Sequence, residues 1–189
     1  KYRFSAPKAT RGESCFFKIL SHIILLYMKV IIWVMIIILI GLGIYYTGVY
    51  TYFIENKVSE KLPEMTPAQN QQTPTEPKIL KQGDFVDADF FHKGSGRTYI
   101  LEYPDGRKIL RFENFEVVNG PDLYVYLSKT TNPTGDLESL GDFIDLGRLK
   151  GNIGDQNYEL PKNIIAETFS SVVIWCKKFG VLFPYAILR

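Results

Sequence analysis

The feature that most constrains this chain is a run of 25 residues, 30–54, that contains no charged side chain. A helix of that length rises about 37 Å at roughly 1.5 Å per residue, which exceeds the ~30 Å hydrocarbon core of a bilayer. Its apolar residues show no 3.6-residue period, so it does not resemble a surface helix with one polar face. Trp33 lies near one end and four tyrosines lie near the other, as in interfacial belts. The sequence therefore predicts one transmembrane helix over 30–54.

The charges on either side of this run predict its orientation. Residues 1–29 hold six Lys/Arg and one Glu, whereas 30–82 hold four of each sign and 83–189 hold twelve basic and fifteen acidic residues. The positive-inside rule places the basic segment 1–29 in the cytoplasm or at its interface and the C-terminal part outside the cell membrane, a signal-anchor arrangement. The apolar stretch 16–28 is too short to span by itself, and we expect it to extend the helix or to lie in the interface.

Residues 55–82 have the composition of a tether. They contain four prolines, a Gln-Asn-Gln-Gln run and several threonines, with almost no large apolar side chains. Such a segment buries too little apolar surface to offset the entropy lost on ordering. We therefore predict a Pro/Gln/Thr-rich linker, extended and partly in polyproline II conformation.

The outer part of the chain, 83–189, has the pattern of an all-β domain. Turn residues recur at short intervals, and no long segment has the 3.6-residue period of a helix. Pro104-Asp105-Gly106 between two apolar runs predicts a hairpin. Strands are expected at 85–91, 97–103, 108–118, 123–128, 143–149, 156–160, 171–177 and 181–188. The predicted fold is an extracytoplasmic β-sandwich or barrel-like domain attached to one N-terminal transmembrane α-helix.

Composition narrows the functional classes. With a net charge of +2 and 46% hydrophobic residues, the chain is neither wholly disordered nor a strongly basic nucleic-acid binder. Its two cysteines do not make a disulfide-dense scaffold. The hydrolase motif G-x-S-x-G and the zinc-protease motif H-E-x-x-H are absent from the sequence. Enzymatic activity stays open, and the sequence favours a protein that is not an enzyme by itself.

Four segments, in this order, carry a resemblance to a known family: GDFVDADFFHKGSGRTYI, NGPDLYVYLS, LGRLKGNIGDQNYELP and SSVVIWCKKFGVLF. Over 83–188 the chain resembles the DM-thirteen, or electron-transfer DM, domain family. The resemblance implies a part in electron transfer or oxidative modification at the cell surface, a role proposed for the family chiefly from its domain associations. It also implies a single cysteine in a Trp-Cys context, matched here by Trp175-Cys176, as a free redox thiol or a ligand to a prosthetic group.

Cys176 is the only cysteine of the outer domain, and Cys15 is expected on the other side of the membrane. The two cannot form an intrachain disulfide in the inserted protein. An odd cysteine outside the cytoplasm indicates an intermolecular bridge, a ligand or a protected thiol. Unpaired cysteine is also among the most buried residue types, and Val172, Ile174 and Cys176 alternate onto one strand face as core residues do. A reactive thiol would need a lowered pKa, to which Lys178 on the same face would contribute.

His92, the one histidine of this domain, is the second candidate for a catalytic residue or ligand. A blue-copper site needs two His and one Cys, and structural zinc needs four N or S ligands, so counting argues against both. We predict no metal site; Asp84, Asp87 and Asp89 would be the ligands if calcium bound. Haem with Cys176 or His92 as axial ligand stays open, but no local motif such as C-x-x-C-H indicates it, and the cofactor is unknown.

The sequence thus predicts a single-pass, membrane-anchored cell-surface protein whose outer β-domain takes part in electron transfer or redox modification through Cys176. The alternative is a non-catalytic accessory or structural subunit that docks on a larger membrane or cell-envelope complex. A carbohydrate- or surface-layer-binding module rests on fold analogy alone. The expected partners are the membrane and other membrane or cell-surface proteins, and no nucleic acid.

Overall fold

The computed structural model describes residues 11–48, 50–51, 54–64 and 76–189, with side chains from Phe17 onward. Residues 1–10 of the predicted basic segment and 65–75 of the predicted linker lie outside the described residues. The chain divides into two compact units, one ending at Thr47 and one spanning Gly48–Arg189.

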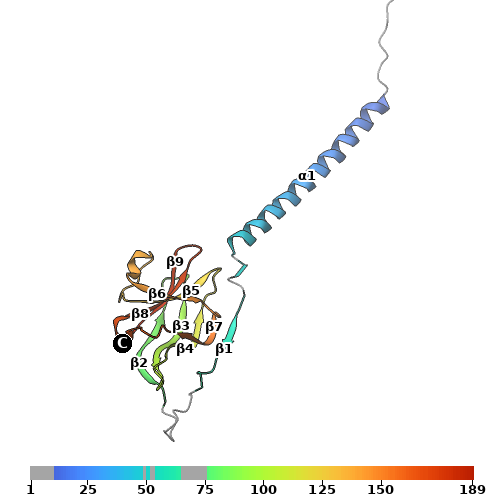
Figure 1. Cartoon of the computed structure of the whole chain (residues 1–189). Helices are drawn as coiled ribbons and strands as arrows, with labels where there is room; N and C mark the ends of the chain where they lie inside the picture. The colour runs from blue at the N-terminus through green and yellow to red at the C-terminus, as the bar shows by residue number, and fades with distance from the viewer. Residues whose placement is uncertain (1–10, 49, 52–53, 65–75) are drawn as a thin grey trace, which may run out of the picture. The chain divides into compact units, whose positions relative to one another are not determined.

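The first unit contains the helix α1, Arg11–Thr47 (Figure 1). Its part Phe17–Thr47 is 31 residues long, with a window of mean hydropathy 3.0 that is 0% buried inside the structure. The length and the apolar composition of this part of α1 are sufficient for a helix that crosses a membrane. The stretch 16–28 is continuous with the helix, which was one of its two expected placements. The helix ends before the predicted limit at Ile54, because Gly48 adopts a φ of 72° that stops a right-handed helix.

The second unit is one nine-stranded sheet that curls into a half-barrel (Figure 1). The order along the sheet is β1-β7-β4-β3-β2-β9-β8-β5-β6, and every neighbouring pair is antiparallel except β1 with β7. The prediction that an all-β domain follows one apolar helix in the sequence is confirmed. The strands are β1 Lys57–Ser59, β2 Lys78–Val86, β3 Gly94–Glu102, β4 Lys108–Val117, β5 Leu123–Ser128, β6 Phe143–Arg148, β7 Ile153–Glu159, β8 Ser171–Cys176 and β9 Val181–Ile187, with 3-10 turns η2 Glu138–Leu140 and η3 Ala166–Thr168.

The expected hairpin joins β3 and β4. Gly106 takes a φ of 83°, and its N–H donates to the carbonyl of Tyr103 at 2.9 Å. The Asp105 carboxylate accepts from the N–H of Arg107 at 2.9 Å. Glycine at the left-handed position and aspartate as the local acceptor therefore close this turn, as the Pro-Asp-Gly sequence predicts.

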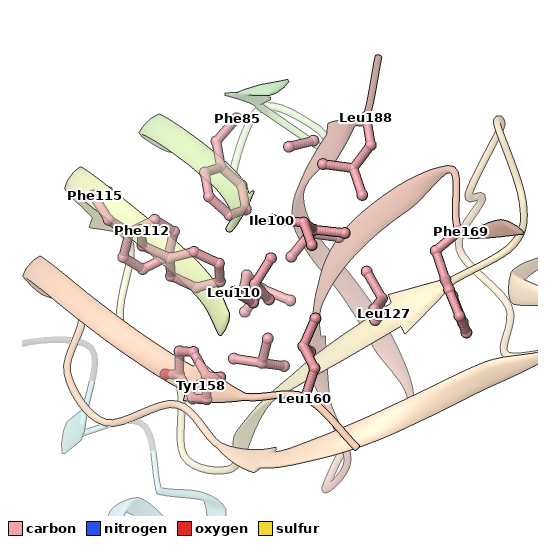
Figure 2. Close-up of a cluster of buried hydrophobic side chains, with 14 of the residues drawn as sticks. Phe85, Ile100, Leu110, Phe112, Phe115, Leu127, Tyr158, Leu160, Phe169 and Leu188 are labelled. Atoms are coloured by element: carbon pink, nitrogen blue, oxygen red, sulfur yellow. The ribbon is translucent and has the colours of Figure 1, made fainter. Parts of the chain in front are cut away.

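The main core lies inside the curl of the sheet, where apolar side chains from both halves meet (Figure 2). The rings of Phe85, Phe112 and Phe115 lie 4.8–5.0 Å apart between centroids, and Tyr158 lies 5.3 Å from Phe112. Aromatic pairs at this separation and tilt add to the stabilisation from area burial. Alternation along each strand supplies these residues, since every second side chain points inward.

A second apolar cluster lies on the other face of β8. It contains Val173 and Trp175 together with Tyr126, Leu140 and Leu182. Leu140 comes from η2, so the β5–β6 connection covers what would otherwise be an exposed sheet face. This covering explains why all six residues of β8 are buried, and why SVVIWC lacks the polar alternation of a half-exposed strand.

The structure differs from the predicted linker at both of its ends. β1 pairs with β7 in the sheet, and β2 begins at Lys78, seven residues before the expected strand start. Room for β1 comes from two glycines: a Cβ on Gly151 would lie 2.5 Å from Cγ2 of Val58, and one on Gly154 would overlap the Val58 carbonyl. Polar composition hid β1, because backbone pairing at a sheet edge requires no apolar side chains. It also hid the first residues of β2, although β2 lies inside the sheet between β3 and β9.

Candidate functional site

Cys176 is the last residue of β8, between Leu123 of β5 and Val181 of β9 in the sheet register. Its exposed fraction is 0%, and it belongs to the main core cluster. It is a free thiol in the described part of the chain. The exposed four-residue turn 177–180 follows directly, closed by a 2.9 Å hydrogen bond from the Gly180 N–H to the Cys176 carbonyl. Cys176 therefore sits inside the core but beside a solvent-exposed turn.

The two lysines after Cys176 belong to this turn and not to the strand. Lys177 Nζ lies 2.6 Å from the Asp145 carboxylate and 3.6 Å from the centroid of the Tyr124 ring. The hydrogen bond to Asp145 raises the pKa of Lys177. Lys178 Nζ lies 5.7 Å from the Phe179 ring centroid. The expectation that the strand continues to Lys177 is wrong, and the first lysine serves the outer surface of β5 and β6.

His92 closes the loop between β2 and β3. Its Nδ1 lies 2.7 Å from Oδ2 of Asp89, and its ring lies 4.5 Å from that of Phe183. The other carboxylate oxygen of Asp89 accepts from the N–H groups of Phe91 and His92. The hydrogen bonds from His92 lower the pKa of Asp89 to about 2. This pair organises the loop, and it also explains why β2 ends at Val86 instead of continuing to residue 91.

The three aspartates considered for calcium have separate partners. Asp84 pairs with Arg97 at 3.3 Å, Asp87 accepts from the Gly94 N–H at 2.9 Å, and Asp89 holds His92. Among the described residues, no group of three or more His, Cys, Asp and Glu side chains is placed to hold a metal ion. The enclosed Cys176 side chain offers no open face to a prosthetic group. The described residues therefore offer no cluster for a metal ion, and Cys176 is not placed to ligate a prosthetic group.

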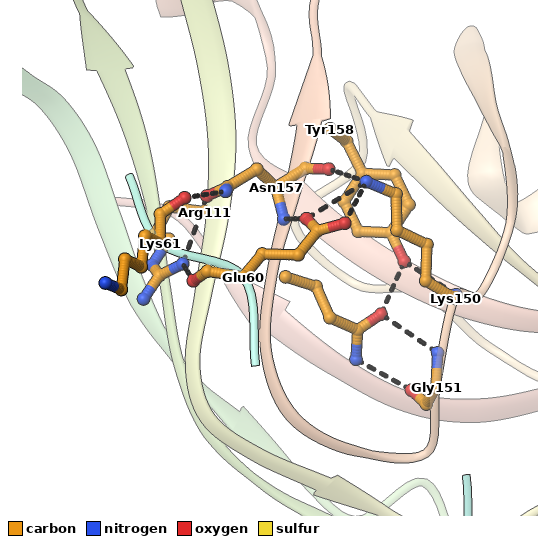
Figure 3. A network of polar contacts seen from close by, with 8 residues as sticks. Glu60, Lys61, Arg111, Lys150, Gly151, Asn157 and Tyr158 are labelled. Atoms are coloured by element: carbon orange, nitrogen blue, oxygen red, sulfur yellow. Dashed lines mark hydrogen bonds and ion pairs between the residues drawn. The ribbon is translucent and has the colours of Figure 1, made fainter. Parts of the chain in front are cut away.

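A polar network on the β1 edge was not predicted from the sequence (Figure 3). The buried Arg111 guanidinium donates to the Glu60 carbonyl at 2.6 Å and to Asp155 Oδ2 at 2.6 Å. The Glu60 carboxylate in turn accepts from Lys150 Nζ at 2.8 Å and from the Asn157 N–H at 2.7 Å. Alternating polar residues on β4 and β7 could indicate a shared polar face, but no sequence pattern links them to Glu60.

The Glu60 carboxylate responds to two opposing influences. Partial burial raises its pKa, but the hydrogen bonds from Lys150 and from the backbone of Asn157 outweigh this, so the pKa lies below its usual value of 4.5. Nearby, Tyr158 donates its hydroxyl to Gln156 at 2.8 Å, and burial raises the Tyr158 pKa. The network therefore holds a carboxylate in its charged form and a phenol in its neutral form.

The edge segment 54–64, which contains β1, also borders a cleft of about 300 Å³. The cleft lies between this segment and the loops that carry Asn119–Leu123 and Arg148–Asn152; neither Cys176 nor His92 lines it. The Asn119 side chain donates to the Ile54 carbonyl at 2.8 Å. The Asn56 N–H donates to the Asn152 side chain at 2.6 Å. These contacts attach the N-terminal part of the edge segment to two loops of the half-barrel.

The fold defines a class of protein in which an all-β half-barrel domain follows an apolar helix in the sequence. In the described part of this chain, the domain encloses the free thiol of Cys176. A family model described as Electron transfer DM13 matches residues 84–188, which is more than half of the chain. The chain therefore belongs to the Electron transfer DM13 family, as the sequence resemblance indicated. Comparison with curated proteins and with solved structures gives no match. The match begins after β1 and within β2, so α1 and the edge segment lie outside the family domain.

Proposed function

We propose that the chain is a single-pass, membrane-anchored cell-surface protein whose DM13 domain takes part in electron transfer or redox modification through Cys176. The electron-transfer description of the family supports the redox role. The long apolar helix supports the anchor, and the basic excess before it supports an extracytoplasmic domain. The observation that carries the role of Cys176 is its place at the end of β8, directly before the exposed turn 177–180.

Local opening of this turn gives the thiol access to a partner. Few contacts need to break, because strand ends and turns open with a smaller free energy than the whole domain. The Cys176 thiolate then attacks a disulfide sulfur of a partner protein. A new S–S bond forms to Cys176, the partner's S–S bond breaks, and the released partner sulfur takes up the proton that Cys176 lost. The partner is reduced at one sulfur and Cys176 is oxidised to the mixed disulfide.

Two turn glycines provide a matched test of this opening. Gly180 (φ 64°) and Gly106 (φ 83°) both adopt left-handed conformations, and no atom lies within 4 Å of a Cβ built on either. Alanine at such a position destabilises its turn by about 1 kcal/mol. In a Cys15→Ser full-length background, Gly180→Ala should raise the rate of maleimide labelling of Cys176 about five-fold, since 1.4 kcal/mol corresponds to a factor of about ten.

The Gly106→Ala variant is the control, because its turn lies at the other end of the half-barrel from Cys176. It should leave the labelling rate unchanged under native conditions. An equal rise in both variants would mean that Cys176 reacts only on global unfolding, which contradicts the proposed access. Incubation with oxidised glutathione should also add one glutathione to Cys176, measured by intact mass, and none to Cys176→Ser.

The full enclosure of Cys176 favours a second candidate function, a non-catalytic accessory subunit of a larger membrane complex. A buried cysteine serves as a small apolar side chain in many cores. In that case Cys176→Ala should keep both the assembly and its activity, and the chain should co-purify in a fixed ratio with its partners in mild detergent. If Cys176→Ala leaves the complex assembled but abolishes the activity of the complex, the result would instead favour the redox role.

A further inference from the structure

The register of the sheet gathers four loops at one end of the half-barrel. Leu123 pairs with Cys176, Cys176 with Val181, and Gly94 with Val117, so the loops 87–93, 118–122 and 177–180 emerge together. The loop 149–152 joins them, because Tyr124 pairs with Arg148. We call this the Gly48 end, since a Cβ on Gly48 would lie 2.7 Å from Cβ of Pro121.

The Gly48 end is where the chain arrives from the apolar helix. Thr47 is the last residue of α1, and Gly48 is the first residue of the β-rich unit. Further along, Ile54 is hydrogen-bonded to Asn119 of the loop 118–122. Only a very short stretch of chain therefore separates these loops from a membrane that contains α1. The effective concentration of the loops at the membrane surface is high for this reason.

Large aromatic side chains are exposed at this end. Phe90 is 78% exposed, Phe91 is 74% exposed and Phe179 is 49% exposed. The rings of Phe90 and Phe91 lie 5.2 Å apart, and Lys93 Nζ lies 5.0 Å from the Phe90 ring centroid. Adjacent exposed aromatics are unfavourable in water and indicate a surface that contacts an apolar or interfacial phase.

The loop that carries Phe90 and Phe91 is ordered by its own hydrogen bonds. Asp89 accepts from the N–H groups of Phe91 and His92 at 2.7 and 2.8 Å. The carbonyl of His92 accepts from the Ala88 N–H at 3.0 Å, and Asp87 accepts from the Gly94 N–H. The two phenylalanines are thus presented by a closed turn, so their insertion into another phase requires little further ordering of the backbone.

The two ends of the half-barrel also differ in charge. The loops 87–93, 118–122, 149–152 and 177–180 hold four lysines and three aspartates. The opposite loops 103–107, 129–142 and 160–170 hold three basic and five acidic residues. The Gly48 end is therefore the more cationic one.

We propose that the Gly48 end rests on the bilayer that holds α1, with Phe90, Phe91 and Phe179 in the interfacial region. Lys93 and Lys178 then face the headgroups and favour anionic lipids, as basic residues do beside membrane-inserted aromatics. This proposal rests on the membrane anchoring proposed above. It assigns the β-domain a fixed end toward the membrane, and it leaves the opposite end to face other proteins.

Fluorescence quenching by brominated lipid tests this contact in the full-length chain. The chain is reconstituted in vesicles of brominated phosphatidylcholine and phosphatidylglycerol, with wild type giving the background from Trp33 and Trp175. Phe91→Trp should add a component that is quenched and emits at shorter wavelength. Ile165→Trp, at a position that is 64% exposed at the opposite end, is the matched control and should add an unquenched component.

Three outcomes separate the claims. Loss of the chain from the vesicles in an alkaline wash would overturn the anchor, and this proposal with it. Retention of the chain with an unquenched tryptophan at position 91 would overturn this proposal alone, and would assign the aromatic loop to a protein partner. Lys93→Glu should reduce quenching of the Phe91→Trp variant in anionic vesicles, whereas Lys162→Glu at the opposite end should not; equal effects would overturn the lysine contacts.

Discussion

Apolar side chains fill the interior of the half-barrel, whereas ion pairs and hydrogen bonds hold β1 at its edge. Aromatic and aliphatic residues from both halves of the sheet fill the curl (Figure 2), and Cys176 belongs to the same cluster. At the β1 edge, Arg111 donates to the backbone carbonyl of Glu60, and Lys150 holds the Glu60 carboxylate (Figure 3). Arg111 also donates to Asp155. The first region lies within the family match, and the second joins the family domain to a segment outside it.

The apolar interior and the polar edge differ in how much they stabilise the domain and in which part of the structure they fix. Apolar burial is non-directional and supplies most of the folding free energy. A polar edge contributes less, because charges that leave water lose hydration that their new partners only partly replace. Its partners do, however, fix one register and one orientation. We infer that the interior stabilises the domain, and that the polar edge fixes where the chain from α1 joins it.

The largest expected effect is on the apolar interior. Phe112 is fully buried and contacts three aromatic rings. Phe112→Ala should lower the free energy of unfolding by about 3–5 kcal/mol, measured by urea denaturation followed by circular dichroism, because a large cavity replaces the ring. Phe90→Ala, at an exposed position, should change it by less than about 0.5 kcal/mol. Similar losses in both variants would contradict a core position for Phe112.

An intermediate effect is expected at the polar edge. Arg111→Met removes the donor to the Glu60 carbonyl and to Asp155. The free energy of unfolding should fall by about 2–3 kcal/mol, because partly buried acceptors lose their partner. Hydrogen exchange should also accelerate at the amides of Glu60 and Asn157. Arg107→Met, which breaks the exposed pair with Asp105, should change stability by less than about 1 kcal/mol. Unchanged exchange at Glu60 in Arg111→Met would show that the network does not hold β1.

The smallest effect is a pH dependence of the same edge. Because the pKa of folded Glu60 lies below 4.5, its stabilising contribution is present above that pH and is lost as the pH falls through the lowered value. Protection factors at Glu60 and Asn157 should therefore decrease below about pH 4, by less than roughly 1 kcal/mol for a half-exposed pair. The loop 87–93 should keep its protection to lower pH, since Asp89 titrates at about 2.

Glu60→Gln sharpens this test, because the amide keeps the shape of the side chain without the titrating group. Its protection factors at Asn157 should start lower and change less between about pH 6 and about pH 3. A pH profile identical to that of wild type would assign the effect to a different carboxylate, with Asp155 as the next group to replace.

Several elements were predictable because local pattern determines them. The Pro-Asp-Gly turn formed where the sequence placed it, and Val172, Ile174 and Cys176 line the core as their alternation indicated. The candidate site was only partly predictable. The strand pattern made a core position one of the open interpretations of Cys176, and the structure decided for it. The pairing of His92 with Asp89, and the separation of the three aspartates, depend on a turn that no periodicity describes.

The sequence by itself determined the apolar helix and the all-β domain, because hydrophobicity and alternation act within short windows of chain. The enclosure of Cys176 was decided by the tertiary structure. Only the tertiary structure decided that β1 joins the sheet and that three exposed phenylalanines share one end with the residues that follow α1. Those features rest on contacts between distant residues: Glu60 meets Asn157 across 97 positions. Such contacts leave no local pattern, since backbone pairing and the meeting of loops depend on how the whole sheet curls.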